Sequence, residues 1–224
     1  MDSVALNSGP GAAIYSSLVL KIYDAWVLGL SNSFAWGCPT DEVLLPFYRQ
    51  HVGGRHLDVG VGTGYYLHHM PAAAQRRVTL FDLNANSLRA AAGRMRQRPE
   101  AMISGDILAP GEALKGREFD SIALFYLLHC LPGTMTQKES VFAHLKHSLS
   151  ADGVLYGATI LGDAAGHNGF GGYLMKVYNK KGIFGNAQDT LEGLSAALER
   201  HFAEVRLTQH GRVVLFAARG AIGG

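Results

Sequence analysis

An acidic residue followed by three alternating glycines is the part of this sequence with the clearest chemical meaning. Segment 56–64 reads His-Leu-Asp-Val-Gly-Val-Gly-Thr-Gly, so Asp58 stands two residues before Gly60, and Gly62 and Gly64 follow. Glycine lets a ligand approach the backbone closely and tolerates positive φ angles. The residues after the loop have a helical pattern, and the first N–H groups of a helix lack partners within it. These features predict a ligand site at the end of a strand.

The spacing of these glycines argues against a dinucleotide. The dinucleotide fingerprint is G-x-G-x-x-G or G-x-G-x-x-A, whereas Gly60, Gly62 and Gly64 give G-x-G-x-G and Tyr65 takes the place of the third small residue. The carboxylate of Asp58 would repel a pyrophosphate and attract an amino or sulfonium group. Both observations favour a cationic ligand over NAD, and a nicotinamide dehydrogenase is kept as an outside alternative.

The D-x-G-x-G-x-G loop resembles that of the class I S-adenosylmethionine-dependent methyltransferases, in particular small-molecule enzymes of methyltransferase types 11 and 12, as in secondary metabolism. The resemblance covers roughly residues 55–218. It implies a cofactor, S-adenosylmethionine, whose product is S-adenosylhomocysteine. It also implies that the loop faces the methionine end and the ribose of this cofactor, through Asp58, Gly60, Gly62, Thr63 and Gly64.

Two further acidic residues follow the next two expected strands. In the family, an acidic residue after strand two binds the ribose hydroxyls, and Asp82 stands there with Leu83 beside it. A third acidic residue meets the adenine amino group, and Asp106 matches it, with Ile107 adding to the adenine site. A carboxylate can accept hydrogen bonds from two vicinal hydroxyls. Each acid alone could be a loop carboxylate or a helix cap, but three at successive strand ends support one another.

Candidate catalytic residues follow the fourth and fifth expected strands. Family members place active-site residues after strand four, where this chain has Phe125, assigned to the cofactor site, and His129. A histidine ordinarily titrates near neutral pH, so His129 is a candidate general base. His167 is the second catalytic candidate. A packed histidine or a solvated loop residue is the competing interpretation.

The polar, glycine-rich segment 161–188 lies where the family often builds a substrate lid, and loops on a rigid scaffold commonly carry sites. Its substrate-binding candidates are Asn168, Tyr178, Asn179 and Asn186. From the N-terminal part of the chain, Tyr15 and Trp36 are cofactor-site candidates, because an aromatic face attracts a sulfonium cation. The alternative is that these two aromatic residues bury the N-terminal part on the sheet.

Short apolar runs alternate with helical patterns from residue 55 onward, which predicts βαβ units and a parallel sheet. The expected strands are 56–59, 78–81, 101–104, 121–125 and 153–159, and the expected helices are 64–70, 84–96 and 136–149. A last helix begins at Asp189 or Thr190, with Asp189 and Glu192 as a possible capping box. Runs 205–208 and 212–217 then flank a turn and predict an antiparallel hairpin.

The predicted fold is therefore an α/β, Rossmann-like, doubly wound sheet of seven strands, mostly parallel, with a C-terminal antiparallel hairpin and an N-terminal helical cap. Residues 1–50 are expected to form the cap or lid, with a leader over 1–13 and helices over 14–30 and 41–50, the latter capped by Asp41 or Thr40. Residues 51–224 are expected to form the cofactor-binding domain, as one structural unit with the cap.

Composition argues against several other classes of protein. The chain has 224 residues, 48% of them hydrophobic and 17% charged, with a net charge of +2 and scattered Lys and Arg, which disfavours nucleic acid as a partner. Stretch 17–30 is interrupted by Lys21 and Asp24, so it is too short and polar to span a bilayer. Two distant cysteines without CxxC spacing predict no metal site and a cytoplasmic location. A monomer and a homodimer stay equally open.

The function predicted from the sequence is methyl transfer to a small-molecule acceptor, with an oxygen atom, in a carboxylate or a hydroxyl, favoured. Such a transfer is an in-line displacement in which the protein mainly aligns the partners. A small-molecule N- or C-methyltransferase is the first alternative. A protein of the same fold that binds S-adenosylmethionine without transferring the methyl group is the second.

Overall fold

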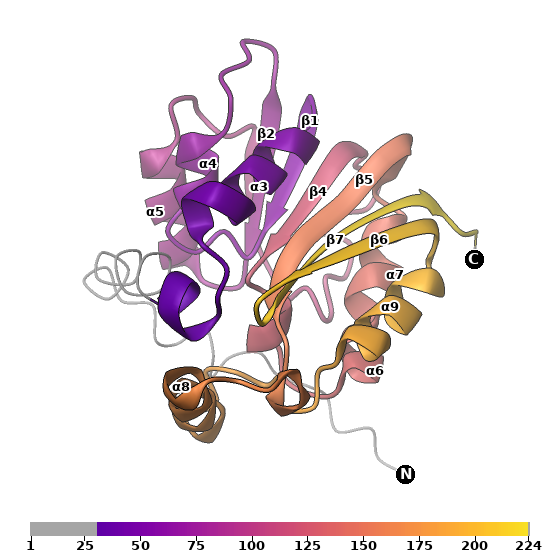
Figure 1. The fold of residues 1–224 in the computed structure, drawn as a ribbon. Coiled ribbons are helices and arrows are strands. Elements are labelled where there is room, and N and C mark those ends of the chain that lie inside the picture. The colour runs from indigo at the N-terminus through magenta and orange to yellow at the C-terminus, as the bar shows by residue number, and fades with distance from the viewer. Residues whose placement is uncertain (1–30, 224) are drawn as a thin grey trace.

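The computed structural model describes residues 31–223, and Figure 1 shows its arrangement. The expected leader over 1–13, the expected helix over 14–30 and Tyr15 lie outside the described residues. Seven strands form one sheet in the order β3-β2-β1-β4-β5-β7-β6. Their bounds are β1 (Arg55–Val59), β2 (Arg77–Asp82), β3 (Ala101–Ser104), β4 (Phe119–Phe125), β5 (Leu149–Ile160), β6 (Phe202–His210) and β7 (Val213–Ala221).

The pairing of these strands confirms the predicted sheet. Strands β1 to β5 pair in parallel, whereas β7 is antiparallel to both β5 and β6. Successive strands are added on one side of β1 as far as β3, and β4 then pairs with the other side of β1. The carboxyl ends of β1 and β4 therefore lie beside each other at this switch point, where ligands bind in such sheets.

Alternation along the strands builds one apolar core on each face of the sheet. In β4, for example, Ala123 and Phe125 belong to one buried cluster, and Ile122 and Leu124 belong to the other. Successive side chains of a strand point to opposite faces, so each face of a central strand must be covered by helices.

Two helical layers cover the two faces (Figure 1). The first layer, extended by the π-helix η2 (Thr40–Leu44), contains α3 (Leu45–His51), α4 (Tyr65–His69) and α5 (Ala85–Arg94). The second contains α6 (Met135–Lys138), α7 (Ser140–Lys146) and α9 (Leu191–Glu199). Tyr48 of α3 belongs to the same buried cluster as residues of the sheet, and Phe47 packs against this cluster. The predicted boundary at residue 50 stays a prediction.

Several predicted element ends are wrong. The expected helix 136–149 is two short helices, α6 and α7, and its last residue already belongs to β5. Thr190 is the N-cap of α9, and its hydroxyl accepts the N–H of Gly193 at 3.0 Å. The Asp189–Glu192 capping box is therefore absent, since the Asp189 side chain is buried in an ion pair. Pro39, rather than Asp41 or Thr40, precedes the helical turn at 40–44.

The predicted polar lid 161–188 contains packed helices. After η4 (Asp163–Ala165), the segment forms α8 (Gly169–Lys180), which lies beyond the carboxyl-end edge of the sheet (Figure 1). Leu174 and Met175 of α8 are buried in the cluster that also contains Trp36. Glycine disfavours helices, so the three glycines in the first turn of α8 hide its pattern. Gly171 is needed there, because a Cβ would lie 2.8 Å from the carbonyl oxygen of Ala35.

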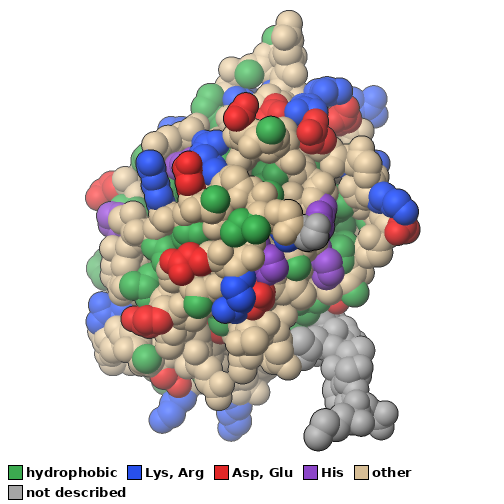
Figure 2. All heavy atoms as spheres, turned by 90° about the vertical axis from the view of Figure 1, so that its right-hand side faces the viewer, with side chains coloured by type: hydrophobic (Ala, Val, Ile, Leu, Met, Phe, Trp, Pro, Cys, Tyr) green, Lys and Arg blue, Asp and Glu red, His purple; other side chains and the backbone are tan. Residues whose placement is uncertain are grey.

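The face of the molecule on the side of β6, α7 and α9 carries both signs of charge. Figure 2 shows Lys and Arg interspersed with Asp and Glu on this face, among apolar and neutral side chains. Within the described part of the chain, no helix has the length and apolar character needed to cross a membrane.

Candidate functional site

The glycine loop forms a tight turn between β1 and α4. Gly60, Gly62 and Gly64 have φ angles of 74°, 51° and 75°, which other residues rarely adopt. A Cβ on Gly64 would lie only 2.6 Å from Cα of Ala91, so glycine at this position also lets α4 approach α5 closely. The predicted loop is therefore shaped both for ligand approach and for packing of the first helical layer.

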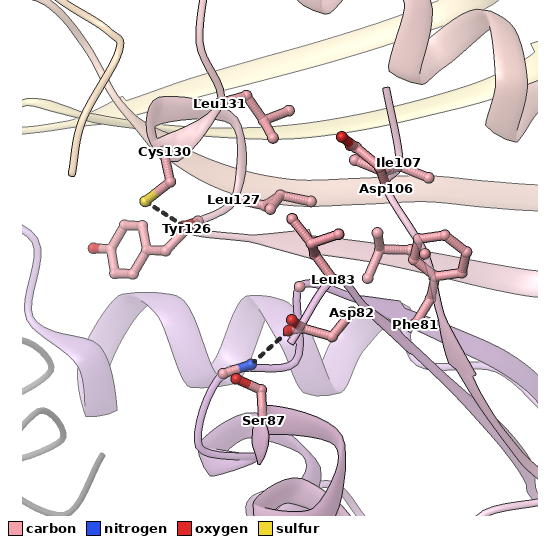
Figure 3. Close-up of a pocket in the computed structure, with 14 residues that line it drawn as sticks. Phe81, Asp82, Leu83, Ser87, Asp106, Ile107, Tyr126, Leu127, Cys130 and Leu131 are labelled. Atoms are coloured by element: carbon pink, nitrogen blue, oxygen red, sulfur yellow. Dashed lines mark hydrogen bonds between the residues drawn. The ribbon is translucent and has the colours of Figure 1, made fainter. Parts of the chain in front are cut away.

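A hollow of about 640 Å³ lies beside this loop at the carboxyl ends of the first four strands. In Figure 3, side chains from different strand ends converge on it. Its lining includes the predicted residues Gly60, Gly62, Asp82, Leu83, Asp106 and Ile107. It also includes Ser87, Tyr126, Leu127, Cys130 and Leu131, which the sequence analysis did not assign to the site.

A second hollow of about 540 Å³ is also lined by the loop and shares Gly60, Gly62 and Tyr126 with the first. The remaining predicted loop residues line it, together with several aromatic rings: Asp58, Thr63, Gly64, Tyr65, Tyr66 and Phe125. The ring centroids of Tyr66 and Phe125 are 4.6 Å apart. The second hollow is thus lined by a carboxylate and by aromatic rings.

Asp82 is held at the end of β2 by backbone donors. The N–H of Asn84 donates to Oδ1 at 2.8 Å. The N–H of Gly62 donates to Oδ2 at 3.4 Å (Figure 3). Burial raises the pKa of Asp82 to about 6, and the backbone N–H groups partly oppose this rise. Asp82 therefore changes its charge within the range of ordinary buffers.

Asp106, Ile107 and Leu83 form the far wall of the first hollow. Oδ1 of Asp106 accepts the N–H of Leu108 at 3.0 Å, which fixes the turn after β3. Leu83 is 36% exposed at the hollow, whereas Ile107 is only 4% exposed. An apolar side chain exposed in a hollow offers a flat surface to a ring system such as a purine.

Tyr126 has an unusual backbone conformation directly after β4. Its φ angle of 58° is the only positive one for a non-glycine residue in the described part of the chain. Its N–H donates to the carbonyl of Ala158 at 2.8 Å, which ties this turn to β5. Strained residues cluster at functional sites, and Tyr126 lines both hollows. The position of this residue after strand four was the available signal in the sequence.

The structure argues against His129 as a general base. The side chain is 2% exposed, and the N–H of Ile160 donates to its Nδ1 at 3.3 Å. Burial and the nearby Lys138 ammonium lower the pKa of His129 to about 3. An imidazole of such low basicity is a poor proton acceptor, and His129 does not line either hollow. The packed-histidine interpretation describes this residue.

His167 and the four predicted substrate residues also have structural contacts, and none of them lines either hollow. Nε2 of His167 lies 2.9 Å from the carbonyl oxygen of Gly162, and its ring packs edge-on against Trp36. Asn186 is fully buried, and its amide donates to the carbonyl of Ile160 at 2.9 Å. We therefore assign these two residues to holding segment 161–188 on the sheet.

The remaining lid candidates belong to α8. Asn168 caps the helix by accepting the N–H of Gly171 at 2.7 Å. The amide of Asn179 donates to Oδ1 of Asn186 at 3.2 Å, and the ring of Tyr178 packs against Phe184. These contacts do not place a polar group toward either hollow.

The structure buries Trp36, which the sequence analysis placed in the cofactor site, and Trp36 lines neither hollow. Trp36 is 1% exposed in the apolar cluster between α8 and the sheet, away from both hollows. This matches the alternative in which the aromatic residue buries the N-terminal part.

Burial raises the pKa of the Cys38 and Cys130 thiols to about 12, which leaves them protonated at neutral pH. Within residues 31–223 no three His, Cys, Asp or Glu side chains gather as metal ligands do.

Comparison with known proteins identifies the family to which this chain belongs. A family model described as a methyltransferase domain matches residues 57–155. The chain is 48% identical to the uncharacterized protein YbcY of Escherichia coli strain K12, over 86% of this chain and 99% of that one. It is 41% identical to the physcion biosynthesis cluster O-methyltransferase of Aspergillus chevalieri, over 93% of this chain and 94% of that one. The chain therefore belongs to the class I S-adenosylmethionine-dependent methyltransferases.

A solved structure supports the same fold. The N-methyltransferase NodS of Bradyrhizobium japonicum WM9, in complex with S-adenosylhomocysteine, superposes with a TM-score of 0.59 at 16% identity, covering 91% of this chain and 97% of that one. Because the sequence comparisons place the chain in the methyltransferase family, this protein is an enzyme that uses S-adenosylmethionine, and the dehydrogenase alternative is set aside.

Proposed function

We propose that this methyltransferase acts on an oxygen atom of a small metabolite, a carboxylate or a phenolate. The observation that carries the proposal is the pair of adjoining hollows that the glycine loop lines, one with Asp82 and the other with Asp58 and aromatic rings. A cofactor that has an adenosine at one end and a charged methionine at the other fits this division.

The proposed cofactor contacts follow the charge of each wall. The carboxylate of Asp82 accepts hydrogen bonds from the ribose hydroxyls, and Asp58 attracts the methionine amino group. The adenine lies between Leu83 and Ile107, with Asp106 at its amino group. The loop Gly60–Gly64 allows the cofactor to approach the backbone. S-adenosylmethionine supplies the methyl group when it is bound.

The lining of the hollows also indicates the type of acceptor. The described residues that line them include neither His nor Lys, so none of these lining residues offers an imidazole or an amine to take a proton. A carboxylate or phenolate is already nucleophilic and needs only alignment and exclusion of water. The rings of Phe125, Tyr66 and Tyr126 provide a surface suited to a sulfonium cation.

Sequence similarity, cysteine content and surface charge support the remaining parts of the proposal, which are the source of the acceptor, the oligomeric state and the location. Similarity to an O-methyltransferase of a biosynthesis cluster supports an acceptor from secondary metabolism. We propose a monomer or homodimer in the cytoplasm that acts on free metabolites, neither on nucleic acid nor at a membrane. The interspersed charges in Figure 2 and the presence of only two cysteines support this.

A titration followed by a product search tests the proposal. The purified protein is expected to bind S-adenosylmethionine and S-adenosylhomocysteine in the micromolar range by calorimetry, with NAD as the negative control. Mass spectrometry of metabolite mixtures should then detect products heavier by one methylene. Products methylated on nitrogen or carbon would favour the first alternative, and binding without any product would favour a non-methylating protein.

The raised pKa of Asp82 predicts how cofactor binding depends on pH. The ribose hydroxyls donate to the ionised carboxylate, so binding below the pKa of about 6 must first remove a proton. The Kd of S-adenosylhomocysteine should be constant above about pH 7 and should rise as the pH falls through the pKa. Calorimetry across this pH range measures the Kd of S-adenosylhomocysteine. The variant Asp82→Asn should show weaker binding without this rise, and an equal rise in both proteins would contradict the assignment.

A further inference from the structure

An unbroken chain of hydrogen bonds through the interior of the protein ends on Asp58. The N–H of Gly53 lies 2.8 Å from Oγ of Ser121, and this oxygen lies 2.8 Å from Nδ1 of His56. Nε2 of His56 lies 3.1 Å from the hydroxyl of Tyr48, which lies 2.8 Å from Oδ2 of Asp58. The four side chains are at most 6% exposed.

Three elements of the fold bring these groups together. His56 and Asp58 are two residues apart on β1, so their side chains lie on the same face of the sheet. Ser121 is the partner of His56 on β4. Tyr48 comes from α3, which packs on this face. The chain of hydrogen bonds therefore forms only when the sheet and the first helical layer have assembled.

One arrangement of hydrogens satisfies every member when the imidazole is neutral. A carboxylate only accepts, so Tyr48 donates its hydroxyl proton to Asp58, and its oxygen accepts from Nε2–H of His56. Nδ1 of His56 then accepts from the hydroxyl of Ser121, whose oxygen accepts the N–H of Gly53. Every hydrogen bond points toward Asp58, and each one polarises the next. Nε2 of His56 and Oδ2 of Asp58 are 3.6 Å apart, which is too far for a direct hydrogen bond, so the hydroxyl of Tyr48 connects them.

We propose that Tyr48 and His56 are positioning residues that fix the orientation of the Asp58 carboxylate for the amino group of S-adenosylmethionine. This inference rests on the proposed role of Asp58 in binding the cofactor. The hydrogen bond from Tyr48 occupies Oδ2, and among the described residues none is recorded to Oδ1, which leaves this oxygen for the ligand. A carboxylate with one oxygen fixed by a hydrogen bond within the protein cannot rotate away from its ligand.

The test compares two ligands that differ only in the amino group. The variant Tyr48→Phe should bind S-adenosylhomocysteine about tenfold more weakly than the wild type, the size of one hydrogen bond to a charged group. Its affinity for the analogue without the amino group should change less than about twofold, because this ligand makes no contact with Asp58. Calorimetry measures both, and circular dichroism verifies folding.

A second pair of variants tests the next member of the chain. His56→Leu removes the N–H that Tyr48 accepts and should weaken S-adenosylhomocysteine selectively, as Tyr48→Phe does. His56→Gln keeps an N–H close to the place of Nε2 and should restore most of this affinity. These variants decide the question even if Tyr48→Phe does not fold.

The chain offers a matched control in Tyr156. Its hydroxyl is buried in the same apolar cluster, and no hydrogen bond to it is found within the described residues. The Tyr156 ring packs against the rings of Tyr48 and His56, and Tyr156→Phe keeps this ring. The substitution removes one buried hydroxyl and none of the hydrogen bonds that lead to Asp58, so both ligands should bind as they do to the wild type. A Tyr48→Phe variant that weakens both ligands equally, or neither, would overturn the inference. A wild type that binds neither ligand would instead overturn the proposed function, and the inference with it.

Discussion

The substitution Asp82→Ala is expected to weaken the binding of S-adenosylhomocysteine by about 100-fold or more. The carboxylate is proposed to accept hydrogen bonds from both ribose hydroxyls, and each hydrogen bond to a charged group contributes about 1.5–3 kcal/mol. The loss of two such bonds is therefore about 3 kcal/mol or more, which corresponds to two factors of ten in Kd. A calorimetric titration of the purified variant measures the change.

Two controls separate this effect from damage to the loop. Asp82 also accepts the N–H of Asn84, so the variant should be compared with the wild type by circular dichroism and thermal unfolding. Asp163→Ala removes an exposed carboxylate beyond β5 and should leave the affinity unchanged. A well-folded Asp82→Ala variant with wild-type affinity would show that the ribose is bound elsewhere.

The substitution Lys138→Met is expected to cause the largest loss of stability, about 3–5 kcal/mol, because it leaves a buried carboxylate without its counter-ion. Nζ of Lys138 lies 2.6 Å from Oδ2 of Asp189 and 3.0 Å from the carbonyl oxygen of Gly185. Both side chains are at most 1% exposed. The pair joins α6 to the segment before α9, so urea unfolding of the variant should show a strongly lowered midpoint.

The pH dependence of this loss identifies its cause. Burial already raises the pKa of Asp189, and removal of the Lys138 ammonium should raise it further. A carboxyl whose pKa is higher in the folded state than in the unfolded state lowers the free energy of unfolding at every pH where the carboxyl of the unfolded chain is ionised. The deficit should therefore be complete at high pH and shrink as the pH falls toward the pKa of the unfolded chain.

A double variant provides the control for the ion pair. Lys138→Met combined with Asp189→Leu replaces both charges by apolar groups and should recover much of the lost stability. A single Lys138→Met variant that unfolds like the wild type at every pH would show that the pair contributes nothing.

The fold and the cofactor edge were predictable from the sequence because their signals are local. Alternating strand and helix patterns imply parallel pairing, and parallel strands end at the same edge of a sheet. Asp58, Asp82 and Asp106 each lie at or just beyond the carboxyl end of a strand, so their convergence follows from connectivity alone. Glycines at alternate positions likewise indicate a tight turn without knowledge of its neighbours.

Only the tertiary structure decided which side chains after β4 and β5 face the hollows and which are buried. His129, Trp36 and Asn186 look like functional residues in the sequence, but packing of α8 and its flanking loops buries them. The glycines at the start of α8 hide that helix, and one of them, Gly171, is required by its close approach to Ala35. Burial and the direction of a side chain depend on contacts between residues far apart in the chain, and residue type and spacing do not record such contacts. The hydrogen-bonded chain behind Asp58 and the Lys138–Asp189 pair are of the same kind.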